Sequence, residues 1–292
     1  MENCNLFEEC NEEKFLLFGK NGYPILDCHK CLRRFSVIRN SGAHLSQVYS
    51  DDYFFEGKDG YPNYLEEKDI LCNYGVRYAK IISKHTKPGK ILDVGCAAGF
   101  ILKGFESSGW EGHGIEPNAT MAAYGKNELN LDIHIGSLED YKSDQKFDLV
   151  TLIQVIGHFY DVDKSMENAS HLLNQNGLVL VESWNMKSLI ARILGKFWHE
   201  YSPPSVINWF SDESLKKLFK AYGFELIDSG YPAKQINLKH ALSLLKKNSP
   251  NLLFKDKIFH FLTNMLGKLT LIYPPVDLKW YIFQKTFAED LN

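Results

Sequence analysis

From about residue 66 to residue 230, segments typical of β-strands alternate with segments typical of α-helices, and this alternation constrains the fold most. Short apolar or β-branched runs occupy residues 90–94, 111–116, 131–136, 147–155, 178–184 and 224–230. Segments with helical spacing occupy residues 100–109, 118–129, 162–177 and 211–223. This order predicts a mostly parallel sheet with helices on both faces. With a seventh strand expected at residues 279–285, the predicted fold class is α/β with a Rossmann-like, seven-stranded sheet.

Small and polar residues mark the ends of the predicted helices. Gly109 and Gly177 are expected to close the helices that precede them, because glycine accepts the left-handed conformation at a helix end. Ser211 has the side chain of an N-cap, and Gly223 lies just past the end of the same helix.

The chain divides into five expected parts. Four of the six cysteines fall in a segment at residues 1–45. An N-terminal arm and first helix follow at residues 46–89, and the ligand-binding core is expected at residues 90–230. A helical insertion or lid is expected at residues 231–278, before the last strand and tail at residues 279–292.

Charge and hydropathy favour a cytoplasmic protein and argue against a dedicated nucleic-acid binder. The formal net charge is −3, whereas a dedicated nucleic-acid binder usually carries a basic face. The first ten residues contain no apolar core of a secretory signal, and no run reaches the roughly 18 apolar residues of a membrane span. We therefore expect no nucleic-acid partner and no transmembrane segment. The cysteines are expected to serve packing or metal binding in a reducing compartment.

The stretch KILDVGCAAG, residues 90–99, indicates a ligand-binding turn after the first core strand. In a parallel sheet, ligands bind beyond the carboxyl ends of the strands. A dinucleotide fingerprint has three glycines in the order G-x-G-x-x-G, whereas here only Gly95 and Gly99 are present, four residues apart. Asp93 precedes the turn by two residues, and an acid there suits a cationic group better than a pyrophosphate.

Two further features narrow the ligand. Glu116 ends the second core strand, where a carboxylate accepts hydrogen bonds from both ribose hydroxyls. The sequence GSLED at residues 136–140 follows the third strand and offers backbone and polar groups for an adenine edge. Together with Asp93, these features favour S-adenosylmethionine over NAD as the cofactor.

In order and spacing, the segments ILDVGCAAGFIL, GIEPN, GSLEDY, FDLVTLIQVIGHF and LLNQNGLVLVESWN resemble the motifs of class I S-adenosylmethionine-dependent methyltransferases. The resemblance covers roughly residues 66–230 and is nearest to the group that contains the ubiquinone-biosynthesis O-methyltransferase. The segments VYSDDYF and FWHEYSPPSVINWFS, together with the N-terminal cysteines, resemble a bacterial subgroup with a zinc-ribbon-like segment.

The resemblance implies roles for individual residues. The cofactor-binding residues expected from it are Asp93, Gly95, Cys96, Ala97, Gly99, Glu116, Pro117, Ser137, Leu138 and Gln154. Asp93 and Gly95 would contact the methionine part, and Glu116 would bind the ribose. Ser137 and Leu138 would border the adenine. The carbonyl of Gln154 would accept a hydrogen bond from the methionine amine.

The chain departs from the family pattern at three places. Ala97 stands where the family usually has glycine, which narrows the backbone angles permitted there. VIGH replaces the commoner VIEH, and PPSVI replaces a stretch similar to PPEHL. The last change removes a family histidine from the expected acceptor side.

An oxygen acceptor needs a base with a pKa near neutrality, and histidine fits this requirement. His158 follows the fourth core strand and is the first candidate, whereas His199 in KFWHEYSPP is its rival. For both histidines, a role in loop packing is the alternative. Tyr53 and Phe54 are expected either to close over the cofactor or to pack as part of the N-terminal arm.

Cys28 and Cys31 form a C-x-x-C pair that follows a Gly-Tyr-Pro turn, and Cys4 and Cys10 are the second pair for a structural zinc ion. Five residues separate Cys4 from Cys10, where two to four residues are usual. A metal-free turn and a redox dithiol are the alternatives.

The predicted helices of residues 231–278 have three interpretations: packing on the sheet edge, a lid over the acceptor site, or weak peripheral contact with a membrane surface. The predicted function is methyl transfer to a small-molecule acceptor, with an oxygen atom of a sugar or biosynthetic precursor favoured. An RNA methyltransferase and a non-catalytic S-adenosylmethionine-binding protein are the alternatives. The sequence predicts no oligomeric state.

Overall fold

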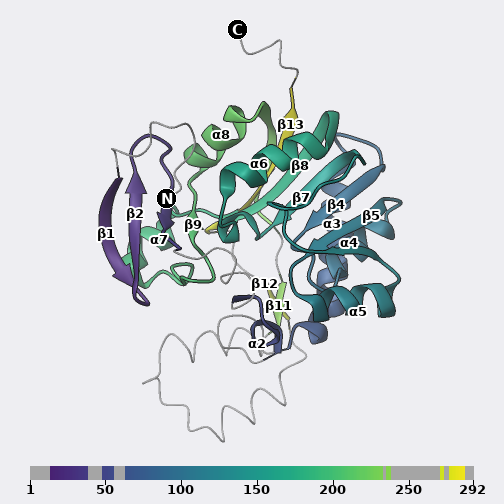
Figure 1. Cartoon of the computed structure of the whole chain (residues 1–292), viewed down its shortest axis with the longest axis horizontal. Helices are drawn as coiled ribbons and strands as arrows, with labels where there is room; N and C mark the ends of the chain where they lie inside the picture. Colours follow the sequence, from purple (N-terminus) through teal and green to yellow (C-terminus); the bar gives the residue numbers. More distant parts are fainter. Residues whose placement is uncertain are drawn as a thin grey trace, which may run out of the picture.

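The structure is a computed structural model of the whole chain. It describes residues 14–38, 48–55, 63–232, 235–237, 270–272 and 276–286. Within these residues, the predicted sheet is present, and helices pack on both of its faces (Figure 1).

The large sheet has seven strands in the order β10-β13-β8-β7-β4-β5-β6. Its parallel strands are β4 (Lys90–Val94), β5 (Glu111–Glu116), β6 (Asp132–Ile135), β7 (Phe147–Ile153) and β8 (Leu173–Trp184). The strand β13 (Leu278–Lys285) runs antiparallel to β8 and to β10 (Phe224–Gly230). The α/β prediction with seven strands is therefore confirmed. The carboxyl ends of β4, β5, β7 and β8 share one edge of the sheet.

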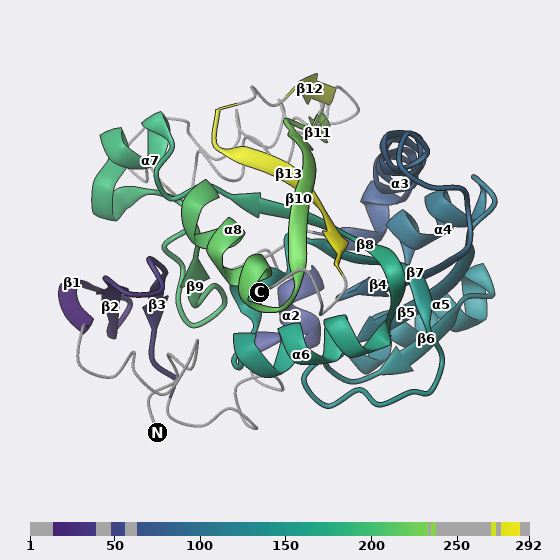
Figure 2. The same cartoon turned by 90° about the horizontal axis from the view of Figure 1, so that it is seen from above.

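Helices α3 (Lys68–Ile82), α4 (Phe100–Glu106) and α5 (Ala119–Leu129) contribute to one buried layer, and α6 (Val162–Leu172) and α8 (Asp212–Ala221) contribute to the other. Figure 2 shows α6 and α8 on one side of the sheet and α3 and α4 on the other. The start of α8 follows the prediction, because Ser211 caps it by accepting a hydrogen bond from the backbone N–H of Ser214.

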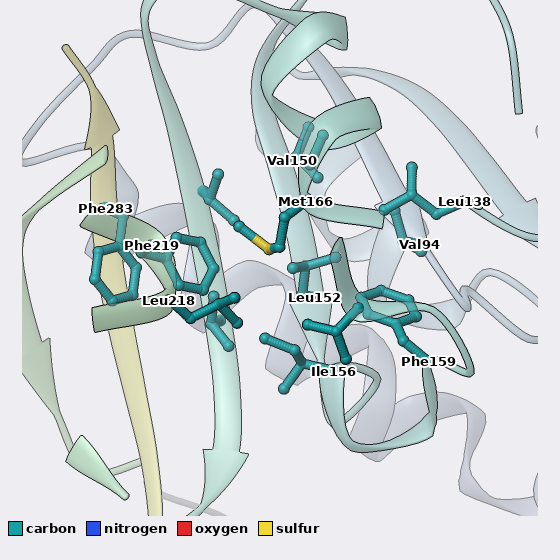
Figure 3. Close-up of a cluster of buried hydrophobic side chains, with 14 of the residues drawn as sticks. Val94, Leu138, Val150, Leu152, Ile156, Phe159, Met166, Leu218, Phe219 and Phe283 are labelled. Atoms are coloured by element: carbon teal, nitrogen blue, oxygen red, sulfur yellow. The ribbon is translucent and has the colours of Figure 1, made fainter. Parts of the chain in front are cut away.

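Apolar side chains fill both layers. On the side of α6 and α8, Met166 and Phe219 lie among side chains of the sheet (Figure 3). Their exposed fraction is 0%. On the opposite side, Phe100 of α4 and Ile82 of α3 are equally buried. Burial of one large apolar side chain contributes roughly 1.5–3 kcal/mol, so these layers supply the main force that fixes the sheet.

The helix predicted at residues 162–177 is shorter than expected. Helix α6 ends at Leu172 and β8 begins at Leu173, so the expected closure at Gly177 is wrong. Leu173 pairs with Phe147 and Leu178 pairs with Leu149, and the residues between them interrupt the pairing. The sequence pattern does not reveal this boundary, because two adjacent apolar residues, Leu172 and Leu173, fit the buried face of a helix as well as the start of a strand.

A second sheet joins the N-terminal segment to a loop far along the chain. Strands β1 (Lys14–Lys20), β2 (Tyr23–Cys28) and β3 (Arg34–Ser36) are antiparallel, and β3 pairs with β9 (Asn208–Trp209). The chain between β8 and β9 carries α7 (Leu189–Leu194) and the 3-10 helix η4 (Gly195–Phe197). Figure 1 shows β1 and β2 at one end of the molecule, next to α7.

The remaining described elements are short. Helix α2 (Asp51–Phe55) and the 3-10 helix η2 (Tyr64–Glu67) precede α3, and η3 (Ile156–His158) follows β7. Strands β11 (Gln235–Asn237) and β12 (Thr270–Ile272) form an antiparallel pair. Residues 235–237 and 270–272 fall inside the insertion that was expected to be helical, so the helix prediction is wrong for these residues. The rest of the predicted helices lies outside the described residues. None of the helices in the described part of the chain has the length and apolar character needed to cross a membrane.

Candidate active site

Four polar side chains lie where parallel strands end at the same edge of the large sheet. Asp93 is in β4, Glu116 ends β5, Gln154 follows β7, and Glu182 is near the end of β8. The three carboxylates are 3%, 3% and 2% exposed, respectively. Buried carboxylates are uncommon without a partner or a ligand, so this edge is the best candidate for a binding site.

In the glycine loop between β4 and α4, neighbouring side chains lie close to the backbone of both glycines. Gly95 has a φ of 66°, and a Cβ atom there would lie 2.7 Å from Cγ2 of Val155. Gly99 has a φ of 79°, and a Cβ atom there would lie 2.3 Å from Cδ1 of Leu131. Side chains are thus excluded at both positions, which explains the four-residue spacing of the glycines.

Ala97 adopts the left-handed conformation that the family glycine would accept without strain. Its φ is 49°, and its side chain is 6% exposed within the apolar layer around α4. The backbone N–H of Ala97 donates a hydrogen bond to Oε2 of Glu116, with an N···O distance of 2.7 Å. Alanine is therefore compatible with the loop, and its amide ties the loop to the carboxylate expected to bind ribose.

Glu116 also accepts a hydrogen bond from the backbone N–H of Asn118, with an N···O distance of 2.8 Å. Burial raises the pKa of Glu116 to about 7, although the two backbone hydrogen bonds oppose the shift. Burial likewise raises the pKa of Asp93 to about 7, against a hydrogen bond from Thr151 Oγ1 at 2.6 Å. Both carboxyl groups therefore change protonation near neutral pH.

Cys96 contributes packing within the loop. Its side chain is 4% exposed, and its Sγ lies 2.6 Å from where a Cβ atom at Gly114 would be. Burial raises the pKa of this thiol well above its usual value. A neutral, buried thiol is a poor nucleophile, so the structure gives Cys96 no chemical role.

Asn118 connects the loop after β5 to the N-terminal arm, residues 48–55. Its Oδ1 accepts a hydrogen bond from the N–H of Met121 and so caps α5. Its Nδ2 donates to the carbonyl of Tyr49 at 2.9 Å and to Oδ1 of Asp51 at 3.0 Å. One side chain therefore anchors the arm directly beside Glu116 and Pro117.

The segment expected to border adenine is a fixed turn after β6. The N–H of Gly136 donates to the carbonyl of Glu116 at 3.0 Å, which holds the turn against the end of β5. Leu138 is 1% exposed, and its carbonyl accepts a hydrogen bond from Asn168 at 2.8 Å. Ser137 accepts through its carbonyl from the N–H of Tyr141 at 3.0 Å.

Gln154 is the second non-glycine residue of the site in the left-handed conformation, with a φ of 57°. Its N–H donates to the carbonyl of Glu182 at 2.9 Å, and its Nε2 donates to Oε1 of Glu182 at 2.7 Å. The next residue, Val155, packs against Gly95. Gln154 therefore lies next to the glycine loop. Its contact with the methionine part stays a prediction.

His158 lies in η3, immediately beyond Gln154 and Val155. Its Nδ1 is 2.9 Å from the carbonyl oxygen of Ser205. A carbonyl only accepts hydrogen bonds, so Nδ1 carries the proton and Nε2 is the basic nitrogen of the neutral ring. The ring of Tyr49 makes an edge contact with the imidazole at 5.8 Å between centroids.

His199 has different surroundings. Its ring contacts Trp184 edge-on at 4.8 Å and Trp198 at 5.9 Å, and its Nε2 lies 3.4 Å from a carboxylate oxygen of Glu200. These contacts are typical of loop architecture. The two predicted bases have different contacts, although His199 and Ser205, which binds His158, lie in the same loop between β8 and β9.

The two arm aromatics also differ from each other. Phe54 is 4% exposed and contacts the ring of Tyr64 edge-on at 5.7 Å, so it packs in the layer around α3 and α4. Tyr53 is partly buried and contacts the rings of Tyr49 and Phe54. Of the two expected roles, closure over the cofactor or packing within the arm, Phe54 therefore has the packing role.

Cys28 and Cys31 lie at the turn between β2 and β3 and are each 2% exposed. The N–H of Cys31 donates to Sγ of Cys28 at 3.5 Å. Cys4 and Cys10 lie outside the described residues. Within the described ranges, no group of three or more His, Cys, Asp or Glu side chains is arranged to hold a metal ion.

Sequence patterns missed several residues of the site: Tyr49, Asn118, Glu182 and Ser205. Glu182 left a readable signal, because an acid inside the apolar run LVLVESW is costly unless it is paired. Asn118 directly precedes a helix and has a capping side chain, but its bonds to the arm are non-local. Ser205 acts through its backbone carbonyl, so its residue type carries no signal.

Comparison with known proteins identifies the family. Residues 70–229 match the family described as "Methyltransferase domain", which covers more than half of the chain. The chain belongs to this family. It is an S-adenosylmethionine-dependent methyltransferase, as the resemblance implied.

Curated relatives point the same way. Over 190 residues the methyltransferase is 27% identical to the ubiquinone biosynthesis O-methyltransferase of Pelagibacter ubique, which spans 58% of this chain and 77% of that protein. Over 135 residues it is 30% identical to the enzyme of the same name from Rhodopseudomonas palustris strain HaA2. That match spans 44% of this chain and about half, 53%, of the relative.

Solved structures share the fold. The magnesium protoporphyrin IX methyltransferase of Synechocystis PCC 6803 aligns with a TM-score of 0.54 at 12% identity, over 82% of this chain and 100% of that one. A SAM-dependent methyltransferase from Archaeoglobus fulgidus aligns with a TM-score of 0.51 at 18% identity, over 76% and 99% of the two chains. These likenesses support the Rossmann-like fold of the methyltransferase.

Proposed function

We propose that this methyltransferase transfers a methyl group to an oxygen atom of a small molecule, either a sugar or a biosynthetic precursor, with His158 as the base. The observation that carries the proposal is the hydrogen bond from His158 Nδ1 to the carbonyl of Ser205. It fixes the tautomer in which Nε2 accepts a proton. The relatives named as O-methyltransferases support oxygen as the acceptor atom.

The residues at the sheet edge suit S-adenosylmethionine by their chemistry. Glu116 offers a buried carboxylate for the two ribose hydroxyls, and Asp93 lies beside Gly95, where the cationic methionine part would approach. The backbone turn at Ser137 and Leu138 would border the adenine. Bound S-adenosylmethionine supplies a methyl group that its sulfonium already activates.

The remaining work of the protein is orientation and proton transfer. His158 Nε2 takes the proton from the acceptor hydroxyl, while Ser205 and the ring of Tyr49 hold the imidazole in place. The N-terminal arm, anchored by Asn118, covers the side of the site next to Glu116 and helps to exclude water.

A panel of hydroxylated acceptors tests this function. We expect His158→Ala to lower turnover by about 100-fold or more, because general bases contribute roughly 100- to 10,000-fold. Calorimetric affinity for S-adenosylmethionine should change by less than about threefold, because His158 is not one of the residues expected to bind the cofactor. His199→Ala is the matched control and should keep most of the turnover. Equal losses in both variants, or full activity of His158→Ala, would contradict the role of His158.

The cysteine segment adds a separate proposal, a structural zinc ion on Cys4, Cys10, Cys28 and Cys31. The buried thiols of Cys28 and Cys31, with the N–H to Sγ bond between them, support it. Metal analysis of the purified protein should give about one equivalent of zinc. Less than about a tenth of an equivalent would exclude the ion. We also propose that the protein is cytoplasmic, because the described cysteines are free thiols, as is usual in a reducing compartment.

A further inference from the structure

Glu182 is a buried acid in an otherwise apolar stretch of β8, and its carboxylate is 2% exposed. Two side chains from different elements donate to it. Gln154 Nε2 donates to Oε1 at 2.7 Å, and the hydroxyl of Tyr78 in α3 donates to Oε2. A charge in such a position is costly unless its geometry is fixed by donors. The arrangement therefore indicates that the acid holds something specific in place.

What Glu182 holds is Gln154. The N–H of Gln154 donates to the Glu182 carbonyl at 2.9 Å, in addition to the side-chain bond. Gln154 has a φ of 57°, a conformation that costs a non-glycine residue about 1–3 kcal/mol. Such a conformation persists only where the surroundings impose it, and here two hydrogen bonds to one residue do so.

The strained turn at Gln154 positions the residues that follow it. The chain leaves β7 at Ile153, turns at Gln154, and packs Val155 against the point where a Cβ atom at Gly95 would lie. His158 follows three residues after Val155, and the N–H of His158 donates to the Val155 carbonyl at 2.8 Å. The turn at Gln154 thus sets both the wall of the glycine loop and the start of η3.

We propose that Glu182 is a positioning residue of the methyltransferase: it locks Gln154 in the left-handed conformation and so orients the Gln154 carbonyl toward the amino-acid end of the cofactor. This inference rests on the proposed placement of the methionine amine at Gln154. Glu182 itself acts through Gln154, and Tyr78 keeps the carboxylate oriented from the side of α3.

The test measures binding of two probes by calorimetry. S-adenosylhomocysteine carries the amino-acid tail, whereas 5′-methylthioadenosine lacks it. Glu182→Ala should weaken binding of S-adenosylhomocysteine by about tenfold, the usual effect of a lost hydrogen bond to a charged group. Binding of 5′-methylthioadenosine should be unchanged. Equal weakening of both probes would overturn the proposal, because general damage to the fold would not distinguish them.

A glycine rescue tests the backbone argument. In the Glu182→Ala background, Gln154→Gly should recover several-fold of the lost affinity for S-adenosylhomocysteine, because glycine adopts a positive φ without strain. Gln154→Ala loses the same side-chain bond but keeps the strain, so it should recover nothing. Equal results for the two double variants would contradict the proposal.

Glu182→Gln keeps an oxygen for Gln154 Nε2 and should retain most of the affinity even if Glu182→Ala folds poorly. A loss in Glu182→Gln as large as that in Glu182→Ala would overturn the proposal. Wild-type protein that binds both probes equally would instead refute the proposed cofactor placement, whereas the hydrogen bonds by which Glu182 holds Gln154 would stand.

Discussion

Ala97 fits the glycine loop although the family usually has glycine at this position. Its positive φ of 49° carries strain, but its methyl group is buried and its N–H donates to Glu116. The resemblance to the family identified this position as a departure, and the residue type alone gave no angle. Conversely, Asp93 and Glu116 could be predicted from sequence because an acid at the end of an apolar strand is itself a signal.

At Ala97 we predict a small effect of glycine and a large effect of valine. Ala97→Gly relieves strain of about 1 kcal/mol or more but loses burial of one methyl group, about 0.8 kcal/mol, so stability should change by less than about 1 kcal/mol. Ala97→Val places a β-branched residue at positive φ and should destabilise by about 2 kcal/mol or more. Urea unfolding measures both. A strongly destabilised glycine variant would contradict this account of the loop.

The raised pKa values of Asp93 and Glu116 predict a pH dependence. Both folded-state pKa values, about 7, exceed the ordinary values of 3.8 and 4.5. The folded protein therefore binds more protons than the unfolded chain between these values. The resulting stability is fully present below the ordinary pKa values and is lost as pH rises through about 7.

The ligand reverses this preference, because ribose hydroxyls donate to the ionised form of Glu116. Affinity for S-adenosylhomocysteine should rise with pH up to about 7, with proton release on binding below that value. Calorimetry in buffers of different ionisation enthalpy measures this release. Glu116→Gln should remove most of it. Affinity that falls with rising pH would contradict an ionised Glu116 in the complex.

At the scale of elements, helices and strands with local signals could be predicted, and those fixed by distant partners could not. The N-cap at Ser211 is a local signal, and α8 begins where it indicates. The boundary between α6 and β8 was missed because Leu173 gains its strand pairing from Phe147 in another element. Likewise, β9 is a strand only because β3 pairs with it.

Asn118 offers a test at this scale, because it caps α5 and anchors the arm. Asn118→Ala should destabilise the protein by about 1 kcal/mol, as for a lost N-cap, and should increase hydrogen exchange in residues 48–55. Ser211→Ala removes the cap of α8, which has no bond to the arm, and is the control. Equal exchange of the arm in both variants would contradict the anchoring role of Asn118.

At the scale of the whole molecule, the two sheets meet around the candidate base. The loop between β8 and β9 joins the small sheet through β9. It supplies the Ser205 carbonyl that binds His158 in η3, which follows β7 of the large sheet. Arg34 of β3 strengthens this junction by donating to the hydroxyl of Tyr201 in the loop, while Asp27 of the neighbouring strand β2 accepts a hydrogen bond from the same guanidinium. The sequence could not predict this role for the cysteine-bearing segment, because Tyr201 lies 167 residues from Arg34 along the chain.

Loosening the junction should therefore affect turnover more than cofactor binding. Arg34→Ala removes the bonds to Asp27 and Tyr201, and we expect turnover to fall several-fold while affinity for S-adenosylmethionine stays within about twofold. Lys187→Ala, which removes only the exposed pair with Glu213, is the control and should change neither quantity. Loss of cofactor affinity in Arg34→Ala would show that the small sheet supports the whole site.

The most direct measurement is calorimetric titration of the protein with S-adenosylhomocysteine and, separately, with NAD. The wild-type protein should bind S-adenosylhomocysteine at one site per chain and give no binding heat with NAD. Glu116→Ala should weaken binding by about tenfold or more, because it removes the carboxylate expected to accept both ribose hydroxyls. Binding of NAD, or unchanged affinity of Glu116→Ala for S-adenosylhomocysteine, would contradict the assignment of this edge of the sheet as the cofactor site.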